Sequence, residues 1–153
     1  MSKRIAREKV VVLAPRPDDE AFGCSATLAQ MAAAGTEINV VILTGGVLRH
    51  EWSDLDSHLA EQKRQAKAEQ RRQKPIQTSD ILGCPTPIFV GWQDGELLQN
   101  AHLSDELTAH FILKSPDLIL APSISGMYRD HRAVAQAALS LLAGLGDYCQ
   151  LAF

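Results

Sequence analysis

A chain of 153 residues, 46% of them hydrophobic, has the length of one ordinary domain and enough apolar side chains for a single core. A formal charge of −3 excludes a general attraction to nucleic acid or anionic membranes, and the basic run at 61–74 is typical of a solvated helix face. Three separated cysteines predict no disulfide framework, and the apolar run before Pro15 is too short for a signal peptide or a membrane span. We therefore expect a cytoplasmic protein without nucleic-acid or membrane partners.

Apolar runs alternate with helical patterns along the chain, which is typical of a parallel sheet covered by helices. We predict strands at 9–14, 37–44, 86–90, 117–121 and 148–153. The intervening helices are predicted at 21–34, at 53–82 with an interruption near Pro75, at 104–114 and at 130–145. Gly35 and Gly83 lie where helix C-caps are expected, and Pro116 follows the third helix as a stop. The prediction is one α/β domain over 1–153, a three-layer Rossmann-like, mostly parallel sheet with helices on both faces.

Two segments lie where the carboxyl end of a strand meets a helix, which is where open α/β sheets build their sites. The first is 16–20, which contains Asp18 and Asp19, and the second is 123–131, which ends in His131. Taken alone, the acidic pair is typical of a helix N-cap and the histidine of a surface residue. Taken together at one sheet edge, they predict a metal site, because aspartate and neutral histidine are ordinary zinc ligands.

These motifs resemble the PIG-L/LmbE-like zinc-dependent N-deacetylases, a family that hydrolyses acetamido groups, mostly on N-acetylglucosamine derivatives. The run Arg16-Pro17-Asp18-Asp19-Glu20 stands where the family has His-Pro-Asp-Asp-Glu. The run Tyr128-Arg129-Asp130-His131 stands where it has His-Pro-Asp-His. Further similarities between the two motifs are Val40 to Gly46, Arg71 upstream of Leu82-Gly83, and Trp92-Gln93-Asp94-Gly95. The resemblance covers nearly the whole chain.

The resemblance implies a role for each matching residue. Asp19 and His131 match two of the family's zinc ligands, and Asp18 matches the general base that acts on metal-bound water. Arg71 and Asp94 are expected near the substrate, which the resemblance implies is a small acetylated amino sugar conjugate. Zinc is the cofactor that the resemblance implies.

Two positions depart from the family pattern. Arg16 stands at the third zinc-ligand position, and a guanidinium has no lone pair for a metal, whereas catalytic zinc needs about three protein ligands. We expect this guanidinium to take the metal's place and bridge Asp18 and Asp19. Tyr128 replaces a histidine thought to polarise the substrate carbonyl, and its hydroxyl can still donate a hydrogen bond to a developing oxyanion.

Two functions remain open on the sequence. One is an N-deacetylase in which a substitute ligand completes the metal site, with His50 in the loop after the second strand as a candidate. The other is a catalytically inactive relative with a degraded metal site, acting as a sugar-binding domain or as a partner or scaffold domain. Family members continue past the strand at 148–153, so we expect the chain to lack the family's C-terminal wall of the substrate cleft. No glycine-rich phosphate-binding motif is present, and Gly45-Gly46 predicts a turn that ends the second strand.

Overall fold

The computed structural model describes residues 9–111, 116–145 and 150–152. Its elements, in chain order, are β1 (Lys9–Ala14), α1 (Asp19–Ala33), β2 (Glu37–Leu48), α2 (Ser57–Leu82), β3 (Ile88–Asp94), the 3₁₀ helix η1 (Leu97–Gln99), α3 (Leu103–Phe111), β4 (Leu118–Leu120), α4 (Arg129–Leu145) and β5 (Gln150–Ala152). Parts of the predicted helix at 104–114 and of the predicted strand at 148–153 lie outside the described residues.

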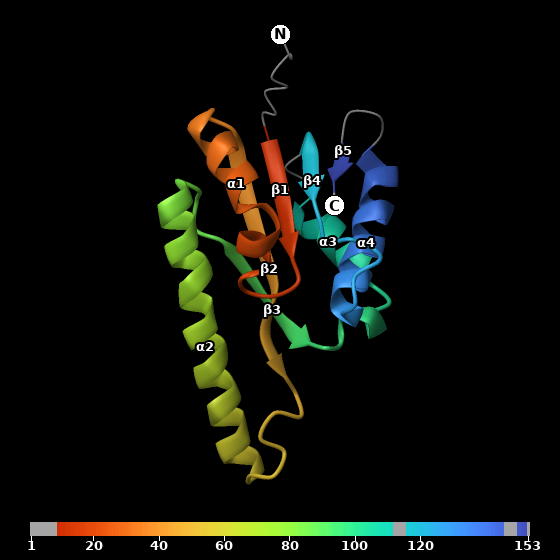
Figure 1. The fold of residues 1–153 in the computed structure, drawn as a ribbon. Coiled ribbons are helices and arrows are strands. Elements are labelled where there is room, and N and C mark those ends of the chain that lie inside the picture. Colours follow the sequence, from red (N-terminus) through yellow and green to blue (C-terminus); the bar gives the residue numbers. More distant parts are fainter. Residues whose placement is uncertain (1–8, 112–115, 146–149, 153) are drawn as a thin grey trace.

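The described strands form one parallel sheet in the order β3-β2-β1-β4-β5. Helices α1 and α2 lie on one face of this sheet, and α3 and α4 lie on the other (Figure 1). The predicted three-layer α/β fold is therefore confirmed. Strand β1 lies between β2 and β4, so the strand order reverses at its carboxyl end, which is where ligands bind in open α/β sheets.

The central strand β1 is buried on both faces. Val11 and Leu13 join the core cluster that includes α4, while Val10, Val12 and Ala14 join the cluster that includes α1. A strand covered on both faces has a continuous apolar run rather than an alternating pattern, as this one does. The two clusters hold the end of β1, and with it the turn that follows, in a fixed place.

Strand β2 is longer than predicted, because it continues through Gly45 and Gly46 to Leu48. The predicted turn at the two glycines is therefore wrong. The pairing of β2 with β3 shifts its register on either side of Thr44, and Gly46 has a φ of 67°, so the strand bends here without ending. Glycine adopts this left-handed conformation without the steric cost that a side chain would bring.

Helix α2 runs without a break through Pro75, so the predicted interruption is wrong. Pro75 and Ser79, four residues later, are both buried on the face that packs toward α1 and β2. Proline removes one backbone hydrogen bond, and the burial of its ring offsets that loss. The predicted C-cap at Gly83 is confirmed, and Gly35 follows the end of α1 with the same left-handed backbone. Among the residues described, no helix is long and apolar enough to cross a bilayer.

Candidate functional site

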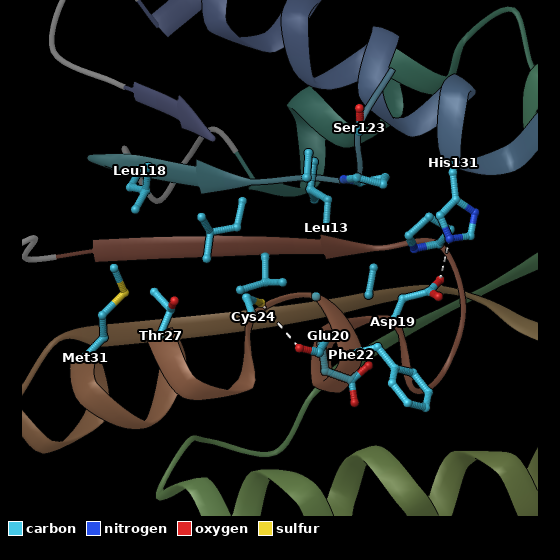
Figure 2. A pocket seen from close by; sticks show the side chains of 17 residues that line it. Leu13, Asp19, Glu20, Phe22, Cys24, Thr27, Met31, Leu118, Ser123 and His131 are labelled. Carbon is cyan, nitrogen blue, oxygen red and sulfur yellow. Dashed lines mark hydrogen bonds and ion pairs between the residues drawn. The ribbon is translucent and has the colours of Figure 1, made fainter. Parts of the chain in front are cut away.

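Asp19 and His131 meet at the carboxyl edge of the sheet. Asp19 is the first residue of α1, after the short turn that follows β1, and His131 lies in the first turn of α4, after the loop that follows β4. Oδ2 of Asp19 is 3.2 Å from Nε2 of His131, and Figure 2 shows the two side chains pointing toward one another. Nδ1 of His131 is buried and has no hydrogen-bond partner within the described part of the chain. The parallel pairing of β1 with β4 brings these distant residues together.

Arg16 lies against the same carboxylate. Its backbone N–H donates to Oδ2 of Asp19 over 2.9 Å, and its side-chain Nε is 4.0 Å from that oxygen. The guanidinium carbon lies 4.4 Å from the centre of the Tyr128 ring, a cation–π arrangement. The Tyr128 ring is in turn 5.3 Å from the His131 ring, measured between centroids. Arg16, Tyr128 and His131 therefore lie in a row beside Asp19, with the two rings tilted by 40° to one another.

Asp18 faces a different set of partners. It has a left-handed φ of 82°, whereas Asp19 begins the helix, so the two neighbouring carboxylates contact different groups. Oδ2 of Asp18 lies 3.8 Å from Nη2 of Arg71 and 3.7 Å from Nζ of Lys74, both on α2. The predicted bridge from Arg16 to both aspartates is wrong for Asp18, because α2 supplies its counter-charges. Asp18 also makes no side-chain capping bond to α1.

Arg71 connects three elements at the site. Its guanidinium donates hydrogen bonds to the carbonyl oxygen of Gly46 in β2 and, over 3.2 Å, to the carbonyl oxygen of Pro17 after β1. Sequence reasoning placed Arg71 near the site but missed Lys74. Lys74 could have been predicted from its position three residues after Arg71, because residues three apart on a helix lie on the same face.

Asp94 ends β3 and is only 5% exposed. The Thr44 hydroxyl lies 3.2 Å from Oδ1 of Asp94 and 2.9 Å from the carbonyl oxygen of Pro15, so it shares its proton between two acceptors. Burial raises the pKa of Asp94; the charge of Arg16 opposes the rise and that of Asp130 adds to it. Asp94 therefore lies within the electrostatic reach of Arg16, and the structure brings it to the predicted site.

Two acidic residues that sequence reasoning gave no role at the site are buried beside it. The carboxylate of Asp130 accepts hydrogen bonds from the backbone N–H of Gly95 over 2.6 Å and of Leu97 over 3.1 Å, which ties the loop after β3 to α4. Glu20 has no hydrogen-bond partner for either carboxylate oxygen among the described residues. Burial raises the pKa of Glu20 to about 7, and the charges of Asp18 and Asp19 add to the rise.

An apolar pocket of about 620 Å³ lies next to the Asp19–His131 pair, between β1, β4 and α1 (Figure 2). Val12 of β1, Leu118 of β4 and Met31 of α1 contribute to its walls. Phe22 also lines the pocket and is 91% exposed. Sequence periodicity did not predict this pocket, because it depends on which parts of the β1–β4 face a helix covers.

The donors at the site do not fit a catalytic zinc ion. Asp19 and His131 provide two ligand atoms, but the guanidinium at Arg16 offers only N–H donors. Over residues 9–111, 116–145 and 150–152, no group of three His, Cys, Asp or Glu side chains could hold a metal. The exposed His50 is therefore not brought to Asp19 and His131 as a substitute ligand.

Comparison with known proteins shows a match to a family and to its fold. The family model described as PIG-L, GlcNAc-PI de-N-acetylase, matches residues 11–142. No curated protein matches the chain.

Solved structures share this fold over most of the chain. The N,N′-diacetylchitobiose deacetylase from Pyrococcus horikoshii aligns with a TM-score of 0.69 at 21% identity, covering 93% of this chain and 52% of that one. The conserved protein TT1542 from Thermus thermophilus aligns at 0.63 and 27%, covering 94% and 60%. The A40926 pseudoaglycone deacetylase Dbv21 aligns at 0.72 and 21%, covering 95% and 62%. The chain thus spans between half and two thirds of the length of these proteins.

Proposed function

Because the chain belongs to the PIG-L (GlcNAc-PI de-N-acetylase) family, we propose that it binds an acetamido sugar of the N-acetylglucosamine type without hydrolysing it through a metal-bound water. The binding site is the sheet edge at the ends of β1, β3 and β4. Support for the ligand class comes from the family description and from the solved deacetylases that share the fold. Support for the absence of hydrolysis comes from residues of this chain.

The position of Arg16 carries the proposal. Its side chain lies beside Asp19 and over Tyr128. The Asp19 oxygen that would bind a metal therefore faces a guanidinium, which is a cation and cannot be a metal ligand. A catalytic zinc holds a water and lowers the pKa of that water to about 7. Among the described residues, this site offers only Asp19 and His131 as zinc ligands, and the Arg16 guanidinium beside them repels a metal cation. These residues therefore do not support activation of water by zinc.

The remaining polar groups suit recognition of a sugar. Tyr128 is 56% exposed and its hydroxyl can donate a hydrogen bond to an acetamide carbonyl. The Asp18 carboxylate, flanked by Arg71 and Lys74, can accept hydrogen bonds from sugar hydroxyls. Asp94 is nearly inaccessible, so we assign it to the floor of the site, where it accepts from Thr44. These groups can bind and orient the sugar, and none of them needs a metal to do so.

A second candidate function is N-deacetylation itself. One observation favours it: Asp19 and His131 still face each other at 3.2 Å, and Asp18 lies next to Asp19 in the chain. Under this alternative, a group beyond the described residues or the substrate itself completes the metal site. The two candidates differ in one measurable product, acetate.

The test combines binding and turnover on the same protein. Calorimetric titration with N,N′-diacetylchitobiose and with its fully deacetylated counterpart measures recognition of the acetyl groups, and acetate release in zinc-containing buffer measures hydrolysis. We expect about tenfold weaker binding without the acetyl groups, since one hydrogen bond is worth about 1.4 kcal/mol here. Tyr128→Phe should lose a similar factor, while His102→Ala, an exposed position on the η1–α3 connection, should bind as the wild type does.

Two results would count against this function. Equal affinity for acetylated and deacetylated sugar would remove the acetamide as the recognised group. Acetate release that disappears in His131→Ala would show instead that the chain is a deacetylase. The His131→Ala protein, purified in the same way, also serves as the control for acetate released by a contaminating enzyme.

A further inference from the structure

Resting on the proposed function, we propose that the Arg16 guanidinium is a built-in cation that stands in for a divalent metal, and that Arg16→His alone creates a zinc site with Asp19 and His131. The two halves of the proposal share one observation, the place of the Arg16 side chain. They make separate predictions. The first concerns the stability of the chain as it is, and the second concerns metal binding after one substitution.

The separation of Asp19 and His131 already suits a metal. Zinc binds carboxylate oxygen at about 2.0–2.2 Å and imidazole nitrogen at about 2.0–2.1 Å, so a tetrahedral ion places two such atoms about 3.4 Å apart. The observed distance between Oδ2 of Asp19 and Nε2 of His131 is 3.2 Å. A zinc ion could therefore enter between them with only a small movement of the side chains.

The backbone at position 16 is fixed beside Asp19 by contacts that do not involve its own side chain. The Arg16 N–H donates to Oδ2 of Asp19. The carbonyl oxygens of the two flanking prolines are also held, that of Pro15 by Thr44 and that of Pro17 by Arg71. A substitution at position 16 thus leaves the turn in place, and an imidazole attached there starts from the side of the same carboxylate.

The guanidinium places a permanent positive charge beside this carboxylate. It lies 4.0 Å from Asp19, and Arg71 and Lys74 are engaged with Asp18 instead. The buried Asp94 and Asp130 add further negative charge on the β3 and α4 side of the site. Removing the charge at position 16 takes a cation away from Asp19 and from the neighbourhood of Asp94, which keeps Arg71 and the Thr44 hydroxyl, whereas a bound Zn²⁺ would restore positive charge beside Asp19.

The metal experiment compares four proteins, each covering residues 1–153. Wild type, Arg16→His, Arg16→His with His131→Ala, and Arg49→His are each incubated with Zn²⁺, passed through a desalting column and assayed for zinc by mass spectrometry. We expect about one zinc per chain in Arg16→His and close to none in the other three. Arg49→His is the matched control, because it adds an imidazole at an exposed arginine that pairs with Glu96. For Arg16→His, the melting temperature should rise by about 5–10 °C at zinc a hundredfold above its Kd.

The stability experiment needs no metal and remains informative even where Arg16→His folds poorly. Arg16→Lys keeps the charge, and Arg16→Ala removes it. We expect Arg16→Lys to melt close to the wild type and Arg16→Ala to melt several degrees lower, with the difference shrinking when high salt screens the acids.

Three outcomes would overturn the proposal: a folded Arg16→His that takes up no zinc, zinc that persists in the double variant, or wild type that binds zinc stoichiometrically. Equal melting of Arg16→Ala and wild type would overturn the stability half. None of these measurements uses a sugar. If Arg16→His takes up zinc but the wild type binds no sugar, only the proposed function is contradicted. If the wild type binds the sugar but Arg16→His takes up no zinc, only this inference is contradicted.

Discussion

Arg71 of α2 approaches the backbone of Gly46 in β2 so closely that a side chain at position 46 would have to displace the guanidinium. Its guanidinium donates to the Gly46 carbonyl, and a Cβ built at Gly46 would lie 2.5 Å from Nη1 of Arg71. The same guanidinium holds the Pro17 carbonyl beside Asp18. A methyl group at position 46 would therefore displace Arg71 and disturb both β2 and the turn that contains Asp18.

Gly46→Ala is expected to destabilise the fold by about 2–4 kcal/mol. The left-handed φ of 67° costs an alanine about 1–2 kcal/mol, and displacing Arg71 adds the loss of its hydrogen bonds. Urea unfolding followed by circular dichroism measures the change. Gly35→Ala is the matched control, because its φ is 80° and a Cβ there meets nothing within 4 Å. Equal losses in the two variants would mean that the contact with Arg71 adds no cost.

Thr44→Val is expected to cost about 1–3 kcal/mol. The substitution keeps the shape of the side chain but removes the hydroxyl shared between Asp94 and the Pro15 carbonyl, both in buried surroundings. Thr44→Ser keeps the hydroxyl and loses only a methyl group, so it should retain most of the stability. A valine variant as stable as the wild type would show that the hydroxyl contributes little to holding Asp94.

We expect the wild-type protein to lose stability between about pH 4.5 and pH 7, and Glu20→Gln to abolish this loss. Burial raises the pKa of Glu20 in the folded protein from 4.5 to about 7, so the unfolded chain releases this proton at lower pH than the folded one. The folded state is therefore favoured below pH 4.5, loses stability as pH rises toward 7, and changes no further above it. The total is about 3 kcal/mol, since each pKa unit is worth 1.36 kcal/mol.

Denaturant unfolding at several pH values measures this dependence. The wild-type stability should fall across the window, while Glu20→Gln should be flatter and more stable than the wild type at pH 8. Glu69→Gln, at an exposed position on α2, should keep the wild-type slope. Parallel curves for wild type and Glu20→Gln would rule out Glu20 as the source of the pH dependence.

The parts of the fold that sequence predicted well are those governed by local pattern. Strand β1 has the bounds predicted for it, because an unbroken apolar run ending at Pro15 leaves few alternatives. The meeting of Asp19 with His131 was also predictable, since parallel strands bring their carboxyl ends to one edge. Both conclusions needed only the type of element and its direction.

The features that sequence missed depend on packing between elements. Local propensity favours a break at Pro75, but its burial keeps α2 intact. The pairing of Asp18 with Lys74 depends on how α2 lies over the turn after β1. The side-chain direction of Arg16 likewise depends on the Tyr128 ring beneath it, which no pattern in the first motif encodes.

The apolar pocket and the exposed ring of Phe22 bear on how unfolding should be followed. Dyes such as ANS fluoresce when they bind accessible apolar surface, and in most folded proteins that signal marks a loss of packing. Here the folded chain already exposes such a surface before heating. The dye fluorescence would therefore be high at the start of a melt and would change little on unfolding. Trp92, which packs against the core, provides a cleaner probe through its intrinsic fluorescence.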